Sequence, residues 1–169
     1  MLENHAKIIA VLRQAGEIVG RKKLQKIVFI AQKLNYPFNE KYHFHFYGPY
    51  SEELTLRVEE LCNLGFLDEV KEAKGHYDQY RYTFTPEGEK FLGHYDVDMP
   101  GLGECIANLN GQSARFLELV STVLHFAHLE RAELEEKVFT LKRKQRYTKE
   151  EIDQAYAYFE ELRSFQPNM

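Results

Sequence analysis

The 169 residues are 44% hydrophobic and include 12 Phe and 11 Tyr, enough apolar surface for a packed core, which excludes an intrinsically disordered chain. No run approaches about 18 apolar residues and the first residues lack a signal-peptide pattern, so we expect a cytoplasmic protein with no membrane association. The net charge of −4 is uneven, because residues 1–50 carry 8 basic and 3 acidic side chains whereas residues 51–100 carry 5 and 12.

Two amphipathic helices are predicted in the first 35 residues. The first has apolar residues at helical spacing, namely Ile8, Ile9, Leu12 and Ala15. The second, which is the most basic helix of the chain, has the apolar residues Leu24, Ile27, Val28, Ala31 and Leu34. Gly16 ends the first helix, and Asn35 with Pro37 ends the second.

The next segment, residues 35–50, is predicted to be extended. Aromatic residues alternate with histidines over residues 41–47, in the order Tyr42, His43, Phe44, His45 and Phe46. This period of two indicates a short strand, which Gly48-Pro49 is expected to end.

A third helix and a hairpin follow. Ser51 can cap a helix that has Glu52 and Glu53 in its first turn and ends at Gly65. Residues 66–71 and 79–84 flank a polar loop and read as a β-hairpin. Thr85-Pro86 then begins a short helix.

The order helix, helix, helix, hairpin is that of a winged helix-turn-helix. We therefore predict an α+β, mainly α, fold with a winged-helix-like domain over residues 1–95, its core at about residues 4–92, interrupted by the insertion 35–50. Four further helical patterns, the last of them opened by a capping box at Thr148, predict an all-helical extension over residues 96–169. We expect this extension to pack on the first half as one compact unit or to form a homodimer.

The stretch RKKLQKIVFIAQKLNYPFNEKYHFHFYGPYSEEL, residues 21–54, resembles the segment that defines the Panacea domain of bacterial antitoxins. The residues that match are Lys23, Leu24, Gln25, Lys26, Phe29, Ala31, Gln32, Tyr47, Gly48 and Pro49. The whole chain resembles the YwgA family of Gram-positive bacteria, which looks like a relative of that domain. The resemblance implies a helical domain that neutralises or regulates another protein by direct contact, or that regulates its own operon.

The second helix carries the main candidate site. Three lysines and one aromatic residue form a single stripe away from its core face, namely Lys22, Lys26, Phe29 and Lys33. Such a stripe fits an acidic, partly apolar protein surface, or a nucleic-acid backbone with base stacking. The alternative is a solvated helix face with Phe29 folded beneath residues 35–50.

Residues 47–51 form a second candidate surface. Gly48-Pro49 imposes a fixed backbone path, so this segment is either a tight structural turn or a rigid edge that presents Tyr47 and Tyr50 to a partner. For DNA, the alternative partner, Arg21 and Lys23 extend the stripe, Lys74 lies in the wing, and Arg143 belongs to a basic run that otherwise complements a helix C-terminus.

The third helix has an acidic outer face, with Glu52, Glu53, Glu59 and Glu60 on or near it. In a winged helix this element reads the major groove, and carboxylates there repel phosphates. The acids are then either solvated, with Leu56 packed under the C-terminal helices, or set against a basic surface of a partner. This face favours a protein over DNA as the partner.

No motif for catalysis or for a cofactor is present. The histidine pairs, His43 with His45 and His125 with His128, lack a Cys or carboxylate at a ligand spacing, and two cysteines do not make a zinc site. We therefore expect no metal, no cofactor and no enzyme activity. The sequence predicts a regulatory protein that binds a partner protein, with a DNA-binding transcriptional regulator as the alternative.

Overall fold

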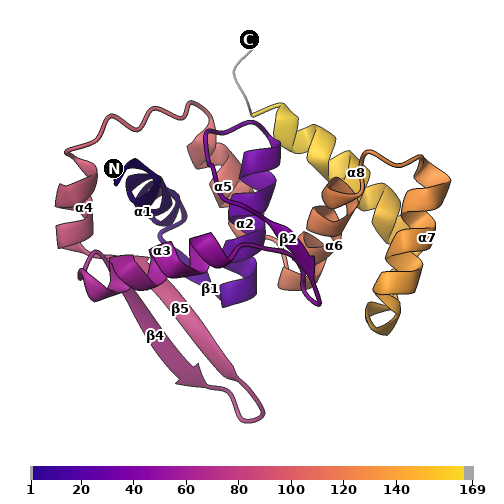
Figure 1. Ribbon diagram of the computed structural model, residues 1–169, viewed down its shortest axis with the longest axis horizontal. Helices are drawn as coiled ribbons and strands as arrows, with labels where there is room; N and C mark the ends of the chain where they lie inside the picture. Colours follow the sequence, from indigo (N-terminus) through magenta and orange to yellow (C-terminus); the bar gives the residue numbers. More distant parts are fainter. Residues whose placement is uncertain (1, 166–169) are drawn as a thin grey trace.

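The computed structural model describes residues 2–165 and shows an α+β, mainly helical protein (Figure 1). The helices are α1 (Glu3–Ala15), α2 (Arg21–Lys33), α3 (Glu52–Asn63), α4 (Pro86–Leu92), α5 (Leu102–Asn110), α6 (Ala114–His125), α7 (Arg131–Leu141), the 3₁₀ turn η1 (Arg143–Gln145) and α8 (Lys149–Arg163). The strands are β1 (Glu17–Val19), β2 (His43–His45), β3 (Gly48–Tyr50), β4 (Leu67–Ala73) and β5 (Asp78–Phe84).

A three-stranded antiparallel sheet in the order β1-β5-β4 projects below α1 and α3 (Figure 1). The hairpin predicted over residues 66–84 is confirmed as β4–β5, with Leu67 opposite Phe84. Strand β1 was not predicted, because it is only three residues long between two glycines. It forms because Ile18, which is fully buried, pairs with Tyr82 of the hairpin.

A second, two-stranded sheet lies in residues 35–51, which we call the covering segment because it crosses α2. His43 pairs with Tyr50 and His45 with Gly48. The prediction that Gly48-Pro49 ends the extended run is wrong, since these residues begin β3. Gly48 has a φ of +85°, which glycine tolerates, and the chain turns back there to pair with β2.

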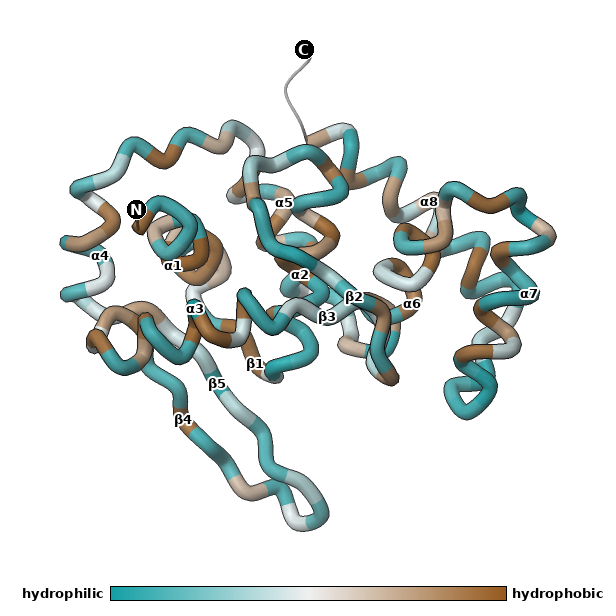
Figure 2. Tube along the Cα trace, in the orientation of Figure 1, coloured by the Kyte–Doolittle hydropathy of each residue, from teal (hydrophilic) through white to brown (hydrophobic). Residues whose placement is uncertain are grey.

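Helix α2 lies in the middle of the molecule and packs against both halves of the chain. It contacts α5 and α6, while α5 also packs on α1 and α6 on α8 (Figure 1). Ile27, Ile30 and Ala31 of α2 are fully buried. Figure 2 shows the hydrophobic residues concentrated on the facing sides of these central helices. Helix α2 therefore serves as a rigid support for the surface segments that pack on it.

The helix starts follow the predicted capping residues. Ser51 Oγ accepts the Leu54 N–H at the start of α3, and Thr85 Oγ1 accepts the Gly88 N–H at the start of α4. Thr148 and Glu151 form the predicted capping box of α8. Among residues 2–165, none of the helices combines the length and the apolar character that crossing a bilayer requires.

Candidate functional site

Gln25 of α2 holds the end of the covering segment through a two-way hydrogen-bond clamp. Its amide nitrogen donates to Ser51 O at 2.9 Å, and its amide oxygen accepts the Ser51 N–H at 2.9 Å. The same nitrogen lies 3.0 Å from Thr55 Oγ1, which contacts the Tyr50 hydroxyl at 2.7 Å. Gln25 and Ser51 are both buried, so these bonds satisfy backbone groups that water does not reach.

Gln32, two helical turns further along α2, repeats this arrangement at Glu40, in the first half of the segment. Its amide nitrogen donates to Glu40 O and its amide oxygen accepts the Glu40 N–H, both at 3.0 Å. The Glu40 carboxylate is itself buried and pairs with Arg57 Nε of α3 at 2.8 Å. The two glutamines thus fasten the covering segment to α2 at Glu40 and at its last residue, Ser51.

Two buried lysines hold residues 46–49, which comprise the turn between β2 and β3 and the first two residues of β3 and which we call the aromatic turn. Lys26 Nζ of α2 donates to Pro49 O at 2.8 Å, and Lys142 Nζ, at the end of α7, donates to Phe46 O at 2.5 Å. Both lysine residues are at most 2% exposed. The turn is therefore held at its two ends by ammonium groups from different helices.

The aromatic turn presents its side chains to solvent. Phe46 is 92% exposed and Tyr47 is 52% exposed. The Lys22 ammonium lies 3.3 Å from the centre of the Tyr47 ring, a cation–π contact. Gly48 faces inward, and a Cβ there would lie 3.4 Å from Thr122 Oγ1 and 3.6 Å from Lys26 Cε. The aromatic side chains are thus outside a backbone that packs on α6.

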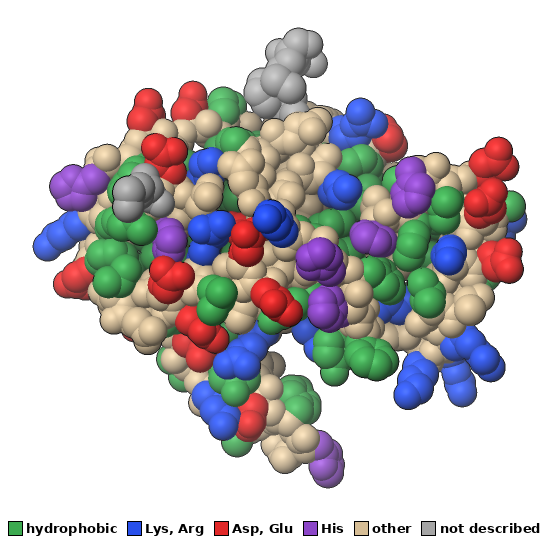
Figure 3. Space-filling model, in the orientation of Figure 1, with side chains coloured by type: hydrophobic (Ala, Val, Ile, Leu, Met, Phe, Trp, Pro, Cys, Tyr) green, Lys and Arg blue, Asp and Glu red, His purple; other side chains and the backbone are tan. Residues whose placement is uncertain are grey.

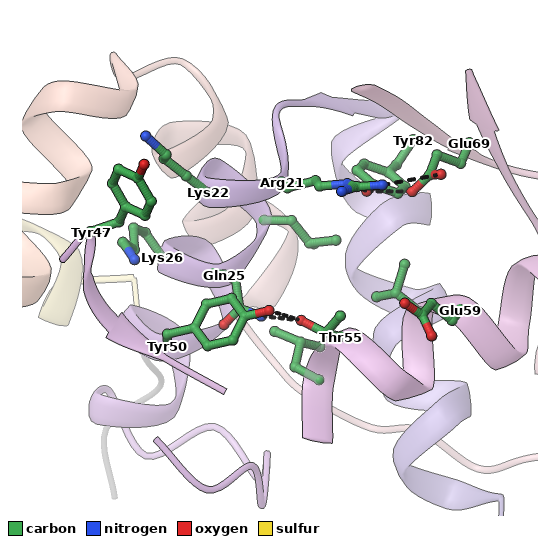
Figure 4. Close-up of a pocket in the computed structure, with 13 residues that line it drawn as sticks. Arg21, Lys22, Gln25, Lys26, Tyr47, Tyr50, Thr55, Glu59, Glu69 and Tyr82 are labelled. Atoms are coloured by element: carbon green, nitrogen blue, oxygen red, sulfur yellow. Dashed lines mark hydrogen bonds and ion pairs between the residues drawn. The ribbon is translucent and has the colours of Figure 1, made fainter. Parts of the chain in front are cut away.

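A groove of about 340 Å³ opens beside this turn, and we call it the apolar groove (Figure 4). It lies between α2, the aromatic turn, α3 and the β4–β5 hairpin. Leu24, Leu54 and Val58 supply apolar walls. Its polar rim includes Arg21, whose guanidinium lies 3.6 Å from Glu69.

A second cavity of about 230 Å³, which we call the lysine cavity, lies on the other side of Tyr47, between α2 and the first turn of α6. Lys22, Lys26 and Tyr47 line both hollows, and Figure 4 shows the Tyr47 ring with the two lysines on either side of it. The remaining lining residues of the lysine cavity are Ala114, Arg115, Glu118 and Gln145. The groove and the cavity are therefore neighbours that share one wall.

The lysines at this site lie in an environment that disfavours their charged form. The pKa of Lys26 is lowered to about 8, mainly by burial; the Glu118 carboxylate opposes this shift, and the positive charges of Lys142 and Lys22 add to it. Burial also lowers the pKa of Lys142, against the opposing effect of Glu118 at 3.4 Å. Glu118 is the shared counter-charge, and the Tyr147 hydroxyl donates to it at 3.1 Å. Positive charge is thus concentrated around one carboxylate.

The structure corrects the predicted stripe on α2. Lys22 and Lys33 are exposed as expected, but Lys26 is 1% exposed and Phe29 is 3% exposed. The covering segment lies over the middle of the stripe, where Tyr42 packs edge-on against Phe29 with 4.9 Å between ring centres. Phe29 is therefore folded beneath this segment, as the alternative interpretation had it, and offers no exposed anchor.

The residues predicted to grip DNA do not form one surface. Arg21 contacts the Tyr80 ring and the Tyr82 hydroxyl, and Lys23 Nζ donates to Asn110 O at 2.6 Å. Lys74 lies at the tip of the β4–β5 hairpin, and Arg143 lies in η1. The hairpin tip and η1 project from the body of the molecule at separate points (Figure 1). Arg21 and Lys23 are thus already engaged within the fold.

The outer face of α3 is open and acidic. Glu52, Glu59 and Glu60 are exposed. Leu56 is 56% exposed, so the expectation that it packs under the C-terminal helices is wrong. Figure 3 shows acidic groups over this region and a separate group of basic side chains below α7. The acidic side chains of α3 and the basic group below α7 are thus apart from each other on this face.

Three important residues were not predicted as part of the site: Phe46, Gln25 and Lys142. The signal for Gln25 was present, because a glutamine beside the buried positions 24, 27 and 28 of a helix indicates a buried polar contact. Lys142 carried no such signal within its basic run, since its partner is 96 residues away.

Residues 2–165 contain no group of three or more His, Cys, Asp and Glu side chains placed to hold a metal ion. The site that the fold defines is a surface one: an exposed aromatic turn, a groove and a basic cavity on a mainly helical α+β protein.

No family model matches the chain. It is similar over nearly its whole length to a protein of Bacillus subtilis (strain 168) named Uncharacterized protein YwgA. The two are 61% identical over 163 residues, which cover 96% of this chain and 98% of that protein. The chain therefore belongs to the YwgA family.

Proposed function

We propose that this protein is a non-catalytic regulatory protein of the cytoplasm that binds a partner protein through the aromatic turn and the apolar groove. The observation that carries the proposal is the exposed Phe46, whose backbone is fixed by the buried ammonium of Lys142 while Lys26 fixes the other end of the turn. Aromatic side chains are common anchors of protein interfaces. Because the turn is already ordered, less conformational entropy is lost when it binds.

The surroundings of the turn support a protein partner. The apolar groove can receive side chains, and its rim carries charges of both signs, including Lys22 and Glu59. The open acidic face of α3 suits a basic protein surface and disfavours a phosphate backbone.

The topology supports a winged-helix-like interpretation of residues 1–95. Helices α1, α2 and α3 precede the β4–β5 hairpin, which β1 extends to three strands. In this interpretation the covering segment is an insertion between the second and third helices, and β4–β5 is the wing.

An antitoxin-like role is the regulatory function that we favour. The residues that carry the resemblance to the Panacea domain supply the clamps of the site, namely Gln25, Lys26, Gln32 and the turn at Gly48-Pro49. The resemblance thus falls on residues with a structural role in this chain, which supports a relation between the YwgA family and that domain, and hence a role in neutralising another protein by contact.

DNA binding is the second candidate, and the observation in its favour is the exposed basic group around η1. Arg143, Lys144 and Arg146 are all exposed (Figure 3). A transcriptional regulator would use these residues with the wing residue Lys74, with Arg21 and Lys23 contributing only if they leave their present contacts.

The test begins with capture of the partner from a Bacillus subtilis lysate by the tagged protein, followed by affinity measurements on the purified pair. Phe46→Ala is expected to weaken binding by about 2 kcal/mol, roughly thirty-fold, because it removes an interface anchor. Tyr77→Ala is the matched control, since Tyr77 is a 63% exposed aromatic residue at the tip of the other hairpin.

Equal affinity of the wild type and the Phe46→Ala variant would contradict the proposal. Recovery of DNA, with binding that weakens steeply with salt and on Arg143→Ala but not on Phe46→Ala, would instead establish the second candidate.

A further inference from the structure

We infer that the lysine cavity is an anion-binding site that receives a carboxylate side chain of the partner segment bound in the apolar groove. This inference rests on the proposed function and names the chemistry of the ligand. Its first support is Lys26, which is buried to 99% yet lines the cavity. Within residues 2–165, one acceptor, Pro49 O, lies within hydrogen-bond distance of its ammonium, which has three N–H groups to donate.

The balance of charge around the cavity favours an anion. Lys22, Lys26 and Arg115 line it against the single carboxylate of Glu118. With the two residues that pair with this set, Lys142 on Glu118 and Glu151 on Arg115, the count is four basic and two acidic side chains. Lys142 and Tyr147 already bind the Glu118 carboxylate. Of the four basic side chains, Lys22 and Lys26 are therefore the two that have no carboxylate within contact distance among the described residues.

The first turn of α6 adds a further positive contribution. Ala114 and Arg115, the first two residues of this 12-residue helix, line the cavity. The helix cap Ser113 accepts the N–H of Phe116, not those of residues 114 and 115. Helix N-termini stabilise anions through such N–H groups and the helix dipole. The helix end and a buried ammonium therefore border the same small space.

The shared wall indicates the source of the anion. Lys22, Lys26 and Tyr47 border both the apolar groove and the lysine cavity, so one short segment can reach into both. Such a segment carries an apolar side chain for the groove next to a carboxylate for the cavity. Because the proposed partner is a protein, Asp or Glu supplies that carboxylate without any modification.

The experiment uses two synthetic dipeptides, Ac-Phe-Asp-NH₂ and Ac-Phe-Asn-NH₂, titrated into the ¹⁵N-labelled full chain, with acetate and inorganic phosphate as separate arms. We expect the Asp peptide to bind roughly ten-fold more tightly than the Asn peptide, because a lysine ammonium binds a charged carboxylate more strongly than the neutral carbonyl of an amide. The amide signals of Tyr47, Ala114 and Arg115 should shift with the Asp peptide.

Three lysine variants locate the effect. Lys26→Met and Lys22→Met should each reduce the preference for the Asp peptide to about two-fold or less. Lys33→Met, an exposed lysine of the same helix, should leave it unchanged. Circular dichroism checks folding, and Lys22→Met carries the test if Lys26→Met does not fold, because Lys22 is exposed.

Equal binding of the two peptides to the wild type would overturn the carboxylate site, as would a preference that survives Lys22→Met. Phosphate binding that the Asp peptide does not displace would also overturn it, in favour of a free anion. None of these results bears on whether Phe46 anchors the partner, so failure of this inference and failure of the proposed function are separately visible.

Discussion

The two hairpins of the molecule project aromatic side chains in the same manner but are held in different ways. The β4–β5 hairpin has seven-residue strands and carries Tyr77 near its tip, whereas β2–β3 has three-residue strands and carries Phe46. Exposed ion pairs such as Lys71 with Asp78 at 3.4 Å brace the long hairpin. Buried hydrogen bonds from α2 and α7 brace the short one.

The comparison shows that the length of the paired strands does not determine how firmly the turn of a hairpin is held. A surface ion pair is worth at most about 1 kcal/mol, whereas a buried donor or acceptor left without its partner costs about 1–3 kcal/mol. The short hairpin is thus held by groups outside itself, and substitutions that remove those groups should have larger effects than matched substitutions in the long hairpin.

The largest effect is expected for Gln25→Leu. This change leaves the buried Ser51 N–H without its acceptor and removes one bond to Ser51 O, so we expect a loss of about 2–4 kcal/mol in the free energy of unfolding. The matched change in the long hairpin, Gln79→Leu, removes a contact of 3.5 Å to Glu72 and should alter stability by less than about 0.5 kcal/mol. Urea unfolding measures the loss in both variants. A loss for Gln25→Leu as small as that for Gln79→Leu would show that the Gln25 clamp does not stabilise the fold.

A smaller effect is expected at the two turn glycines. Gly48 and Gly75 have nearly the same φ, +85° and +87°, and asparagine tolerates this backbone region. The space around them differs: a Cβ at Gly48 would already be in van der Waals contact with Thr122 and Glu118, so the amide beyond it would have to displace neighbours, while nothing lies within 4 Å at Gly75. Gly48→Asn should therefore cost about 1–3 kcal/mol through overpacking, and Gly75→Asn less than about 0.5 kcal/mol. Thermal unfolding compares them; a larger loss at Gly75 would refute the packing argument.

The smallest effect concerns pH. The pKa of Lys26 is lowered to about 8 in the folded state from 10.5, so above pH 8 the unfolded chain holds this proton and the folded chain releases it. Stability from this group therefore rises with pH between about 8 and 10.5. Compared with Lys26→Met, the wild type should gain about 1 kcal/mol from pH 8 to pH 9. Urea unfolding at both pH values gives the difference, and parallel curves for the two proteins would count against a lowered pKa.

The sequence predicted the elements whose signals are local. The starts of α3 and α4 at Ser51 and Thr85 followed from the preference of hydroxyl side chains for helix caps, and the alternation of Tyr80, Tyr82 and Phe84 indicated β5. These signals act within a few residues, so no tertiary contact is needed to recognise them.

The site could not be predicted to the same extent, because it depends on contacts between distant residues. On a helical wheel Lys26 and Phe29 belong to the polar side of α2, and only the position of the covering segment makes them buried. Lys142 looks like one of four basic residues at a helix end until its bond to Phe46 O is known. Tyr47 was among the predicted residues, because it lies next to Gly48-Pro49 in the sequence and its exposure follows from this local turn.

The paired glutamines of α2 also have a consequence for redox chemistry. Gln25 and Gln32 hold Ser51 and Glu40 on one helix and so close the chain between them into a loop, as a disulfide would do. Their amide groups, unlike a disulfide, are neither oxidised nor reduced by thiols. The two cysteines, Cys62 and Cys105, are free thiols in other parts of the fold. The shape of the aromatic turn is therefore independent of the redox potential around the protein.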